Sequence, residues 1–331
     1  MIKKNEFKPG LLYERERKKI EKKLSSLLKN RKPLSLYGPG SYILKGGGKR
    51  IRPLLVLLSA KAVGGRFTDV YNAAVAVELL HNFTLVHDDI MDNADKRRGK
   101  PTLHKKYNMD TAILVGDSLL SIAYECLLKD CNGSTKFVMK EFTRGLIEVC
   151  EGQSLDNEFE SLKNVSIKKY ILMIQKKTAA MAELCCKLGA ILGGGSDTEI
   201  KALAKFGRYL GIAFQIQDDL LDITGNEHEF GKFVGGDLVE GKKTYLFLEA
   251  LNKAKGADRK RLLSIIKNKG IKRNQIDSYK KLYFKLGIID DARKEIQKYS
   301  GKALDQLGYI KKKEDKEILS WLVKSLVGRS K

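Results

Sequence analysis

The chain has 331 residues, 43% of them hydrophobic, and a formal net charge of +23, so it can bury a large core as one big domain or two. Its longest apolar run, 53–60, is much shorter than the 18 residues of a membrane span. The charged N-terminus lacks the apolar core of a signal peptide. We therefore expect neither a membrane-spanning segment nor a secretory signal.

The cysteines are odd in number and form no Cys-x-x-Cys pair. Such cysteines fit buried free thiols in a reducing compartment better than a disulfide framework. We therefore expect a cytoplasmic protein. The cysteines are Cys126, Cys131, Cys150, Cys185 and Cys186.

The positive charge gathers in the first 32 residues and from Lys253 onward, where lysines alternate with glutamates and leucines at helical spacing. This pattern favours the solvated faces of amphipathic helices. Peripheral contact with an anionic membrane would use the same charges and stays open as an alternative. Nucleic-acid binding is not expected, because no zinc-finger spacing, RNA-binding aromatic motif or helix-turn-helix signature is present.

Apolar residues recur at intervals of three and four through most of the chain, which predicts helices. We expect breaks at glycine- or proline-bearing stretches, and no sheet, because strict apolar–polar alternation is absent. One all-α domain with helices around a central cleft is the economical architecture. The expected helices are 11–29, 70–93, 111–129, 137–151, 167–192, 199–223 and 243–253, and the expected breaks are 38–48, 99–101, 193–195 and 224–241.

The first motif, 46–53, combines three glycines with Lys49, Arg50 and Arg52. Glycines let a phosphate approach the backbone closely, and the cations neutralise its charge. The residue after the lysine is arginine rather than serine or threonine, so a nucleotide-binding P-loop is a poor fit.

The expected helix 70–93 carries the first aspartate cluster, Asp88-Asp89-Ile90-Met91-Asp92. Because residues four apart share a helix face, Asp88 and Asp92 point two carboxylates the same way. Carboxylate oxygens suit Mg²⁺, which usually keeps waters and bridges to substrate phosphates. His81 precedes Asp88 by seven residues and returns to nearly the same side, so we expect it to contact the same ligand.

Arg97 and Arg98 follow this helix directly, where the chain must turn. Paired arginines can hold phosphate oxygens bidentately. In a lysine-rich protein the pair alone is weak evidence, but its position beside the carboxylates makes it informative.

The second aspartate cluster, Asp218-Asp219-Leu220-Leu221-Asp222, repeats the same spacing in the expected helix 199–223, with Gln215 on the same side. Lys232 and Lys242 follow, the first within the glycine-rich stretch and the second in the next turn. Both clusters interrupt hydrophobic helices of a basic protein, so a solvated acidic face explains them poorly. Together they predict a paired Mg²⁺–diphosphate site.

Between the clusters, Lys177 and Thr178 lie in an amphipathic helix, and Glu151-Gly152-Gln153 marks a bend. Taken alone, Lys177 is more typical of a surface lysine than of a functional one.

In their order, these segments resemble the motif set of the trans-isoprenyl diphosphate synthases, the polyprenyl synthetase family. The motifs are GGGKRIRP, HNFTLVHDDIMDNADKRRGKPT, GDSLL, EGQ, KKTA, FQIQDDLLD and GKFVGGDLVEGKKT. The match runs from about Lys45 to Thr244, a core of 45–244 flanked by basic helical segments. It implies a single all-α domain over 1–331, folded around a deep central cavity, with the two aspartate helices facing each other near its mouth.

The resemblance also implies an activity and residue roles. A homodimer would condense isopentenyl diphosphate with an allylic diphosphate (dimethylallyl, geranyl or farnesyl), using two or three Mg²⁺ ions per active site. The implied metal ligands are Asp88, Asp92 and Asp218, assisted by Asp89, Asp219 and Asp222, and the catalytic set is Asp88, Asp92, Lys177, Asp218 and Asp219. The allylic diphosphate would be bound by Arg97, Lys177, Thr178, Gln215, Lys232 and Lys242, and isopentenyl diphosphate by Gly48, Lys49, Arg52, His81 and Arg98.

Product length is set in this family just before the first cluster, where this chain has Phe83 and the small Thr84. This pattern resembles the archaeal-type geranylgeranyl diphosphate synthases and implies a twenty-carbon product, with fifteen- and twenty-five-carbon products as alternatives. Helix geometry alone does not place Phe83 at the pocket floor, because it projects about 140° round from Asp88.

Other classes fit less well. A class I terpene cyclase would share the first cluster but should replace the second, and it has no need of the 46–53 or Arg97-Arg98 elements. A non-catalytic regulatory subunit normally lacks one cluster, and this chain has both. A basic nucleic-acid-binding protein would be retained on DNA and show no Mg²⁺-dependent prenyl transfer. Ala94 stands where some relatives have an additional acidic residue.

Overall fold

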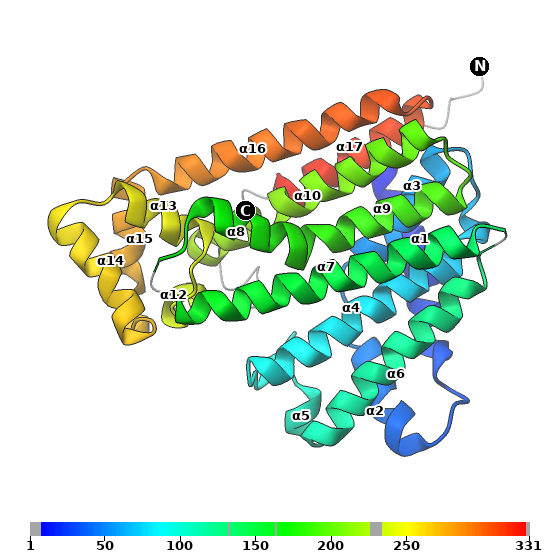
Figure 1. Cartoon of the computed structure of the whole chain (residues 1–331), viewed down its shortest axis with the longest axis horizontal. Helices are drawn as coiled ribbons and strands as arrows, with labels where there is room; N and C mark the ends of the chain where they lie inside the picture. The colour runs from blue at the N-terminus through cyan, green and yellow to red at the C-terminus, as the bar shows by residue number, and fades with distance from the viewer. Residues whose placement is uncertain (1–7, 132, 163, 226–233, 329–331) are drawn as a thin grey trace. The chain divides into compact units, whose positions relative to one another are not determined.

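The computed structural model describes residues 8–131, 133–162, 164–225 and 234–328, which are almost entirely helical (Figure 1). The expected all-α class is confirmed. The helices are α1 (Pro9–Leu27), α2 (Leu34–Leu44), α3 (Ile51–Ala62), α4 (Tyr71–Met91), α5 (Leu103–Lys106), α6 (Met109–Leu128), α7 (Thr135–Ser161), α8 (Ile167–Ile174), α9 (Ala180–Leu192), α10 (Asp197–Thr224), α12 (Gly236–Val239), α13 (Tyr245–Lys253), α14 (Gly256–Asn268), α15 (Ile276–Lys285), α16 (Ile288–Gln306) and α17 (Lys313–Val327). A π-helical turn, η2 (Gln175–Ala179), joins α8 to α9, and 3-10 turns occur at η1 (Phe67–Asp69), η3 (Arg273–Gln275) and η4 (Leu307–Tyr309).

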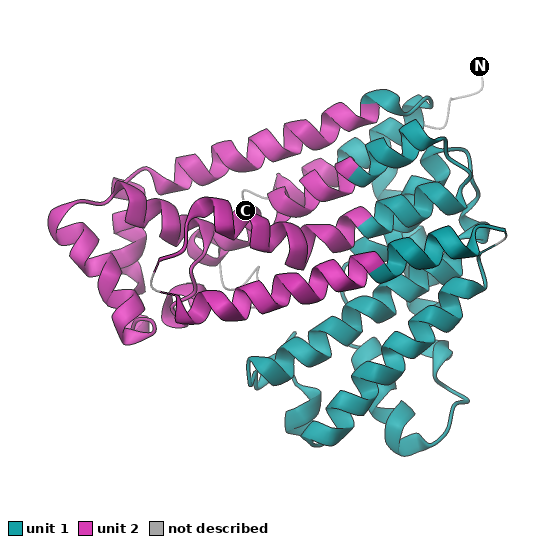
Figure 2. Ribbon diagram, in the orientation of Figure 1, with its two compact units in different colours: residues 1–143, 184–204, 308–321 teal, residues 144–183, 205–307, 322–331 magenta. Residues whose placement is uncertain are grey.

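The chain divides into two compact units (Figure 2). Unit 1 consists of Met1–Thr143, Leu184–Ala204 and Gly308–Trp321, and unit 2 of Arg144–Glu183, Lys205–Leu307 and Leu322–Lys331. The division falls inside α7, α9, α10 and α17, so these helices belong to both units. The single domain over 1–331 stays a prediction.

The core of unit 1 is built on α3 and α4. Helix α3 buries nine of its 12 residues, and α4 buries every residue of its 73–80 segment. Gly193 lets α9 approach α3 closely, because a Cβ there would lie 2.7 Å from the carbonyl oxygen of Ala60. Burying one leucine or valine side chain stabilises a fold by about 1.5–3 kcal/mol. This packing therefore fixes the direction of α4 and of the first aspartate cluster at its end.

In unit 2, α10 packs tightly beside the π-helical turn. A Cβ at Gly211 would lie 2.5 Å from the Cα of Ala179, so only glycine permits this approach. The contact holds the turn that carries Lys177 and Thr178 next to the helix of the second cluster.

Some expected breaks do not occur. Helix α2 passes through Gly38, Pro39 and Gly40 and ends at Leu44, although we expected no helix there. Pro39 and Gly40 are buried, so packing outweighs their poor helix propensity. Helix α7 likewise continues through Gly152, where we expected a bend.

By length and composition alone, helix α6 is long and apolar enough to cross a membrane. We had not expected such a helix, because the sequence has no long uninterrupted apolar run. In its most apolar stretch, 44% of the residues are buried, and the helix packs against α4 and α2 within unit 1. A helix at the edge of a protein core satisfies the same criterion, so this test carries little weight on its own.

Candidate active site

A buried arginine anchors the glycine-rich loop of unit 1. Arg50 adopts the left-handed conformation (φ 50°) just before α3. Its guanidinium donates to Glu78 on α4 at 2.6 Å, to Glu21 on α1 at 2.8 Å and to the carbonyl oxygen of Leu44 at 2.9 Å. Its side chain is 0% exposed and that of Glu78 is 3% exposed. This ion pair therefore ties the loop to the helix of the first cluster.

The next arginine contacts the predicted histidine. Arg52 Nη1 lies 3.2 Å from His81 Nε2. Because a guanidinium only donates hydrogen bonds, Nε2 accepts and the proton of a neutral His81 lies on Nδ1. Burial, and then the charges of Arg52, Arg98, Arg97 and Arg50, lower the pKa of His81 well below its usual range. Four arginines thus gather round a neutral histidine, which is the electrostatic pattern of an anion site.

Arg98 lies at the tip of a two-residue β-hairpin, which corrects the expectation of no sheet. Strands β1 (Lys96–Arg97) and β2 (Lys100–Pro101) pair antiparallel. Arg98 (φ 53°) and Gly99 (φ 74°) form the turn, and positive φ at both positions is the tight geometry such hairpins prefer. The Arg98 guanidinium donates to the carbonyl oxygen of Gly47.

Gly48 has to be glycine for two reasons. Its φ of 138° is strained for any other residue, and a Cβ would lie 3.0 Å from Nη1 of Arg98. The hairpin and the loop of 46–53 are therefore brought together through a backbone that leaves room for the guanidinium. The predicted residues Gly48, Arg52, His81 and Arg98 form one cluster in unit 1.

Arg97 points to the first aspartate cluster instead. Its Nε donates to Asp89 Oδ1 at 2.7 Å, and Asp89 is 2% exposed. Both residues line one pocket in unit 1 together with Asn82 of α4. Burial raises the pKa of Asp89, while Arg97 acts in the opposite direction. Asp89 therefore orients Arg97, and the metal contact that the resemblance implies for Asp89 stays a prediction.

Asp88 and Asp92 lie at the carboxyl end of α4, where Asp92 is the C-cap. The backbone N–H of Asp92 donates to the carbonyl oxygen of Asp88 at 2.8 Å. The carboxyl end of a helix carries partial negative charge, so each carboxylate there costs about 0.3–1 kcal/mol. No basic residue lies in this last turn. A bound cation would remove the cost.

The second cluster ends α10 in unit 2 in the same way, again without a basic residue in the last turn. Burial and the neighbouring Asp237 raise the pKa of Asp219 and of Asp222 to about 7. The Asp237 backbone N–H donates to Asp222 Oδ2 at 3.1 Å. Asp237 thus adds negative charge near both carboxylates, which a bound cation would offset.

A chain of hydrogen bonds fixes Asp219. Thr178 Oγ1 donates to Gln215 Oε1 at 2.9 Å, and Gln215 Nε2 donates to Asp219 Oδ1 at 3.1 Å. The other oxygen, Oδ2, accepts from the hydroxyl of Tyr170 and from the backbone N–H of Tyr245 at 3.0 Å. Thr178, Gln215 and Asp219, predicted separately, therefore form one network, and both oxygens of Asp219 are engaged.

Lys177 lies in the π-helical turn, a local irregularity that is frequent at functional sites. A Cβ on Gly152 of α7 would collide with the Lys177 backbone, so glycine permits the two segments to touch. The Lys177 ammonium is held 2.5 Å from Asp156 Oδ2. This glycine serves close packing rather than the expected bend.

The remaining predicted residues are less informative. Lys242 Nζ is 2.6 Å from Glu240 Oε2, and Lys49 is exposed. Lys232 lies outside the described residues. The Phe83 ring packs against that of His87, with centroids 4.6 Å apart and planes tilted by 55°, and Thr84 Oγ1 donates to the carbonyl oxygen of His81 at 2.9 Å. The roles of these residues stay predictions.

The donor atoms fit a hard divalent cation. Both clusters offer carboxylate oxygens at the carboxyl ends of their helices. In the part of the chain that the structure describes, no three His, Cys, Asp or Glu side chains form a ready-made cage. Mg²⁺ does not require one, because it commonly binds one or two carboxylates together with substrate phosphates and waters.

Several residues of this site were not anticipated from the sequence. Glu78 binds Arg50, which the sequence had singled out only as a cation of the 46–53 motif. Asp237 adds charge beside the second cluster, and Tyr170 binds Asp219. Asp237 stands inside the segment 231–244, so its position was the available signal. Tyr170 and Glu78 lie in helical runs where nothing in the spacing distinguishes them.

Comparisons with known proteins agree on one family. The sequence profile of Polyprenyl synthetase matches residues 34–283. Geranylgeranyl diphosphate synthase of Methanosarcina mazei is 44% identical over 236 residues, 71% of this chain and 73% of that protein. The enzyme of the same name from Sulfolobus acidocaldarius is 39% identical over 284 residues, 85% of this chain and 86% of that protein. The crystal structure of geranylgeranyl pyrophosphate synthetase from Pyrococcus horikoshii matches with a TM-score of 0.89 at 38% identity, covering 97% of this chain and 99% of that one.

Proposed function

The chain belongs to the polyprenyl synthetase family and is a trans-prenyltransferase, and we propose that it joins isopentenyl diphosphate to allylic diphosphates to form geranylgeranyl diphosphate. The observation that supports this proposal most is the group of arginines round neutral His81. The same chain has an aspartate cluster at the carboxyl end of each of two helices, α4 and α10. Such a chain can hold one diphosphate by fixed cations and another through metal.

The arginine cluster is the proposed site of isopentenyl diphosphate. Arg52 and Arg98 would grip the phosphate oxygens bidentately, with Lys49 adding charge at the exposed end of the loop. Neutral His81 would donate from Nδ1 without adding a charge that repels its arginine neighbours. The backbone of Gly48 leaves room for the Arg98 guanidinium that would bind the ligand.

Asp88, Asp92 and Asp218 are the proposed ligands of Mg²⁺, with two or three ions per active site. The ions, when bound, offset the negative charge that grows on the leaving diphosphate. Asp89 would act through Arg97, which it orients, and Asp219 would hold Gln215 and Thr178 in place.

Basic side chains of this protein would also stabilise the negative charge of the leaving diphosphate. Breaking the allylic C–O bond leaves a carbocation and a diphosphate with an added negative charge. Arg97 and Lys177, held by Asp89 and Asp156, would stabilise that charge. The double bond of isopentenyl diphosphate then attacks C1 of the cation, and a proton is lost to the released diphosphate. Apolar surroundings keep water from the cation, and no side-chain nucleophile is needed.

Product length is proposed to depend on Phe83. Its ring packs in a tilted contact against the ring of His87, one turn further along α4, which limits its rotation. A fixed aromatic ring at this position would stop the growing chain at twenty carbons, with Thr84 leaving room beside it. Fifteen- and twenty-five-carbon products are the alternatives.

We also propose a homodimer, because α6 exposes Met109 (53%), Ile113 (40%) and Leu114 (59%), an apolar face that a second copy would cover. Leu114→Lys should then yield monomers in size-exclusion chromatography with light scattering. A cytoplasmic location is supported by Cys126, Cys131 and Cys185, which are buried free thiols. Peripheral contact with anionic membrane is the remaining proposal, supported by the net charge of +23.

The test is a prenyl-transfer assay with Mg²⁺, labelled isopentenyl diphosphate and each allylic primer, followed by sizing of the products. We expect twenty-carbon chains. Asp88→Ala and Asp218→Ala should each lower turnover by a factor of about 10²–10³ or more. Asp305→Ala, an exposed aspartate on α16, serves as the matched control and should retain full rate. Full activity in either cluster variant would refute the assigned role.

A further inference from the structure

The segment from α14 through η3 to α15, residues 256–285, carries an unusual surface, here named the basic hairpin. It holds ten lysines and arginines and only two acidic residues, Asp258 and Asp277. One of these two acidic side chains forms an ion pair within the segment, because Asp258 Oδ2 lies 2.8 Å from Lys285 Nζ. Within this segment, basic residues therefore outnumber acidic ones by eight.

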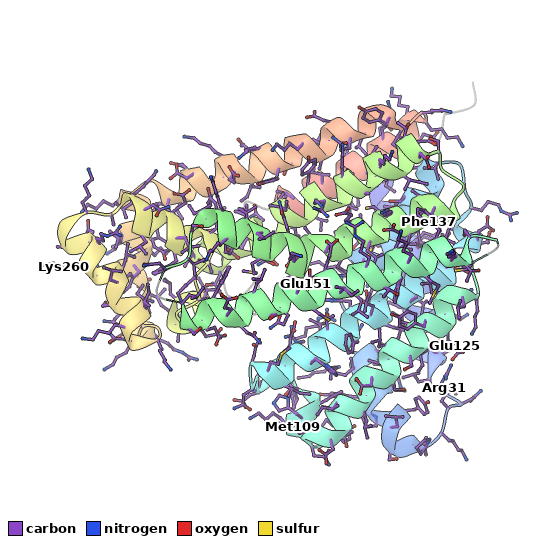
Figure 3. All side chains as sticks on the ribbon, viewed as in Figure 1. Arg31, Met109, Glu125, Phe137, Glu151 and Lys260 are labelled. Carbon is purple, nitrogen blue, oxygen red and sulfur yellow. The ribbon has the colours of Figure 1, made fainter. Side chains whose placement is uncertain are left out.

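On α14, the exposed face combines charge and apolar surface. Lys260, Leu263 and Lys267 are three and four residues apart, so they share one side of the helix. All three are exposed, and Leu263 is 41% exposed, whereas Leu262 and Ile265 are buried in unit 2. Figure 3 marks Lys260 on α14 at the outer edge of the view.

Helix α15 repeats the combination. Lys281 and Phe284 are both exposed, and Phe284 is 53% exposed although it is a large aromatic residue. The opposite side of the helix, with Tyr279 and Tyr283, is buried. In the described part of the chain, Lys260, Lys267 and Lys281 form no ion pair with an acidic side chain.

Contacts between α14 and α15 hold this surface as one piece. The Arg261 guanidinium lies over the ring of Tyr279, 4.4 Å from its centroid. The Tyr279 hydroxyl donates back to the carbonyl oxygen of Arg261 at 3.2 Å. Arg261 also bonds Ser278, and the Lys285–Asp258 pair joins the two far ends. The exposed cations are thus presented on a rigid support, which reduces the entropy lost on binding.

We propose that the basic hairpin is the surface by which this protein docks on anionic lipid bilayers, with Leu263 and Phe284 entering the headgroup layer. The inference rests on the peripheral membrane contact proposed above and assigns it to named residues. Lysines near an anionic surface each strengthen binding about fivefold, and apolar side chains add binding that salt does not screen. A nucleic acid would match the charge but offers no apolar phase for the two exposed side chains.

The test is co-sedimentation of the full chain with vesicles of phosphatidylcholine alone or with 30 mol% phosphatidylglycerol. The charge variant is Lys260→Gln/Lys267→Gln/Lys281→Gln. Its matched control is Lys18→Gln/Lys22→Gln/Lys29→Gln, three exposed lysines of the α1 region, which removes the same net charge. A third variant, Leu263→Ser/Phe284→Ser, removes the apolar contribution.

We expect binding only to the anionic vesicles, a loss of about tenfold or more in the hairpin charge variant, and less than threefold in the control. The apolar variant should lose the binding that survives at 0.5 M salt. Three results would each overturn the proposal. The control variant could lose as much binding as the hairpin charge variant, or the unmodified chain could fail to sediment with the vesicles. The third is tighter binding to DNA that is unchanged in the Leu263→Ser/Phe284→Ser variant. Prenyl transfer measured without vesicles should be the same in all variants, which separates this proposal from the enzymatic one.

Discussion

Replacing Arg50 by methionine tests how the glycine-rich loop is held. The Arg50 guanidinium is 2.6 Å from Glu78, with side chains 0% and 3% exposed. Removing one partner of such a pair leaves a buried charge, which costs about 3–5 kcal/mol of unfolding free energy. Removing both, in Arg50→Met/Glu78→Met, should recover most of this loss, because apolar side chains of similar volume replace a buried pair well. Glu21 contributes less, since it is 30% exposed and can turn to water.

Urea unfolding of the two single variants and the double variant completes a cycle, from which we expect a coupling of about 2 kcal/mol or more. Glu21→Gln is the control and should cost less than about 1 kcal/mol. The folded double variant should raise KM for isopentenyl diphosphate about tenfold while leaving KM for the allylic primer within threefold, because Lys49 and Arg52 flank the lost anchor. Additive single effects would refute the stability argument, and equal changes in both KM values would refute the positioning role.

Three further outcomes are expected. Burial and Asp237 raise the pKa of Asp219 and of Asp222 to about 7, above the 3.8 of an unperturbed aspartate. The metal-free protein should therefore lose unfolding free energy as the pH rises from 5 to 8, because both carboxylates ionise in a place that favours their protonated form. Urea unfolding with EDTA should show this loss, and Asp237→Asn should make it smaller. Phe83→Ala should lengthen the products, and unchanged lengths would remove this ring as the stop. Gly152→Ala should cost about 1–3 kcal/mol or more through collision with the Lys177 backbone, whereas Gly301→Ala on α16, with open space around it, should be neutral or stabilising.

The sequence was sufficient for the class of fold, and the metal chemistry of the clusters stays a prediction. Period-3.6 apolar spacing predicted α4, α6 and α10 within two residues of their ends, because these helices have strongly apolar faces. The paired spacing of Asp88 and Asp92 needed only helix geometry to place two carboxylates together. The resemblance implied Thr178 and Gln215 at the allylic diphosphate and Asp219 at the metal, and the hydrogen-bond network that joins them was not predicted.

Sequence reasoning failed where tertiary packing overrides local preference. We predicted a bend at Gly152, but this residue lies inside α7, because the helix needs a residue without Cβ where it packs against Lys177. We predicted a helix break at Pro39, but α2 continues through this buried residue. The contact between Asp89 and Arg97 was not predicted, because it depends on a hairpin too short to produce a strand pattern.

The most direct test of the central claim is a crystal structure with Mg²⁺ and an unreactive thiolo analogue of an allylic diphosphate. We predict that ions bound to this one diphosphate are coordinated by oxygens of Asp88 and Asp92 from the first cluster and of Asp218 from the second. An analogue whose metals touch only one cluster, or that binds away from both, would contradict the account.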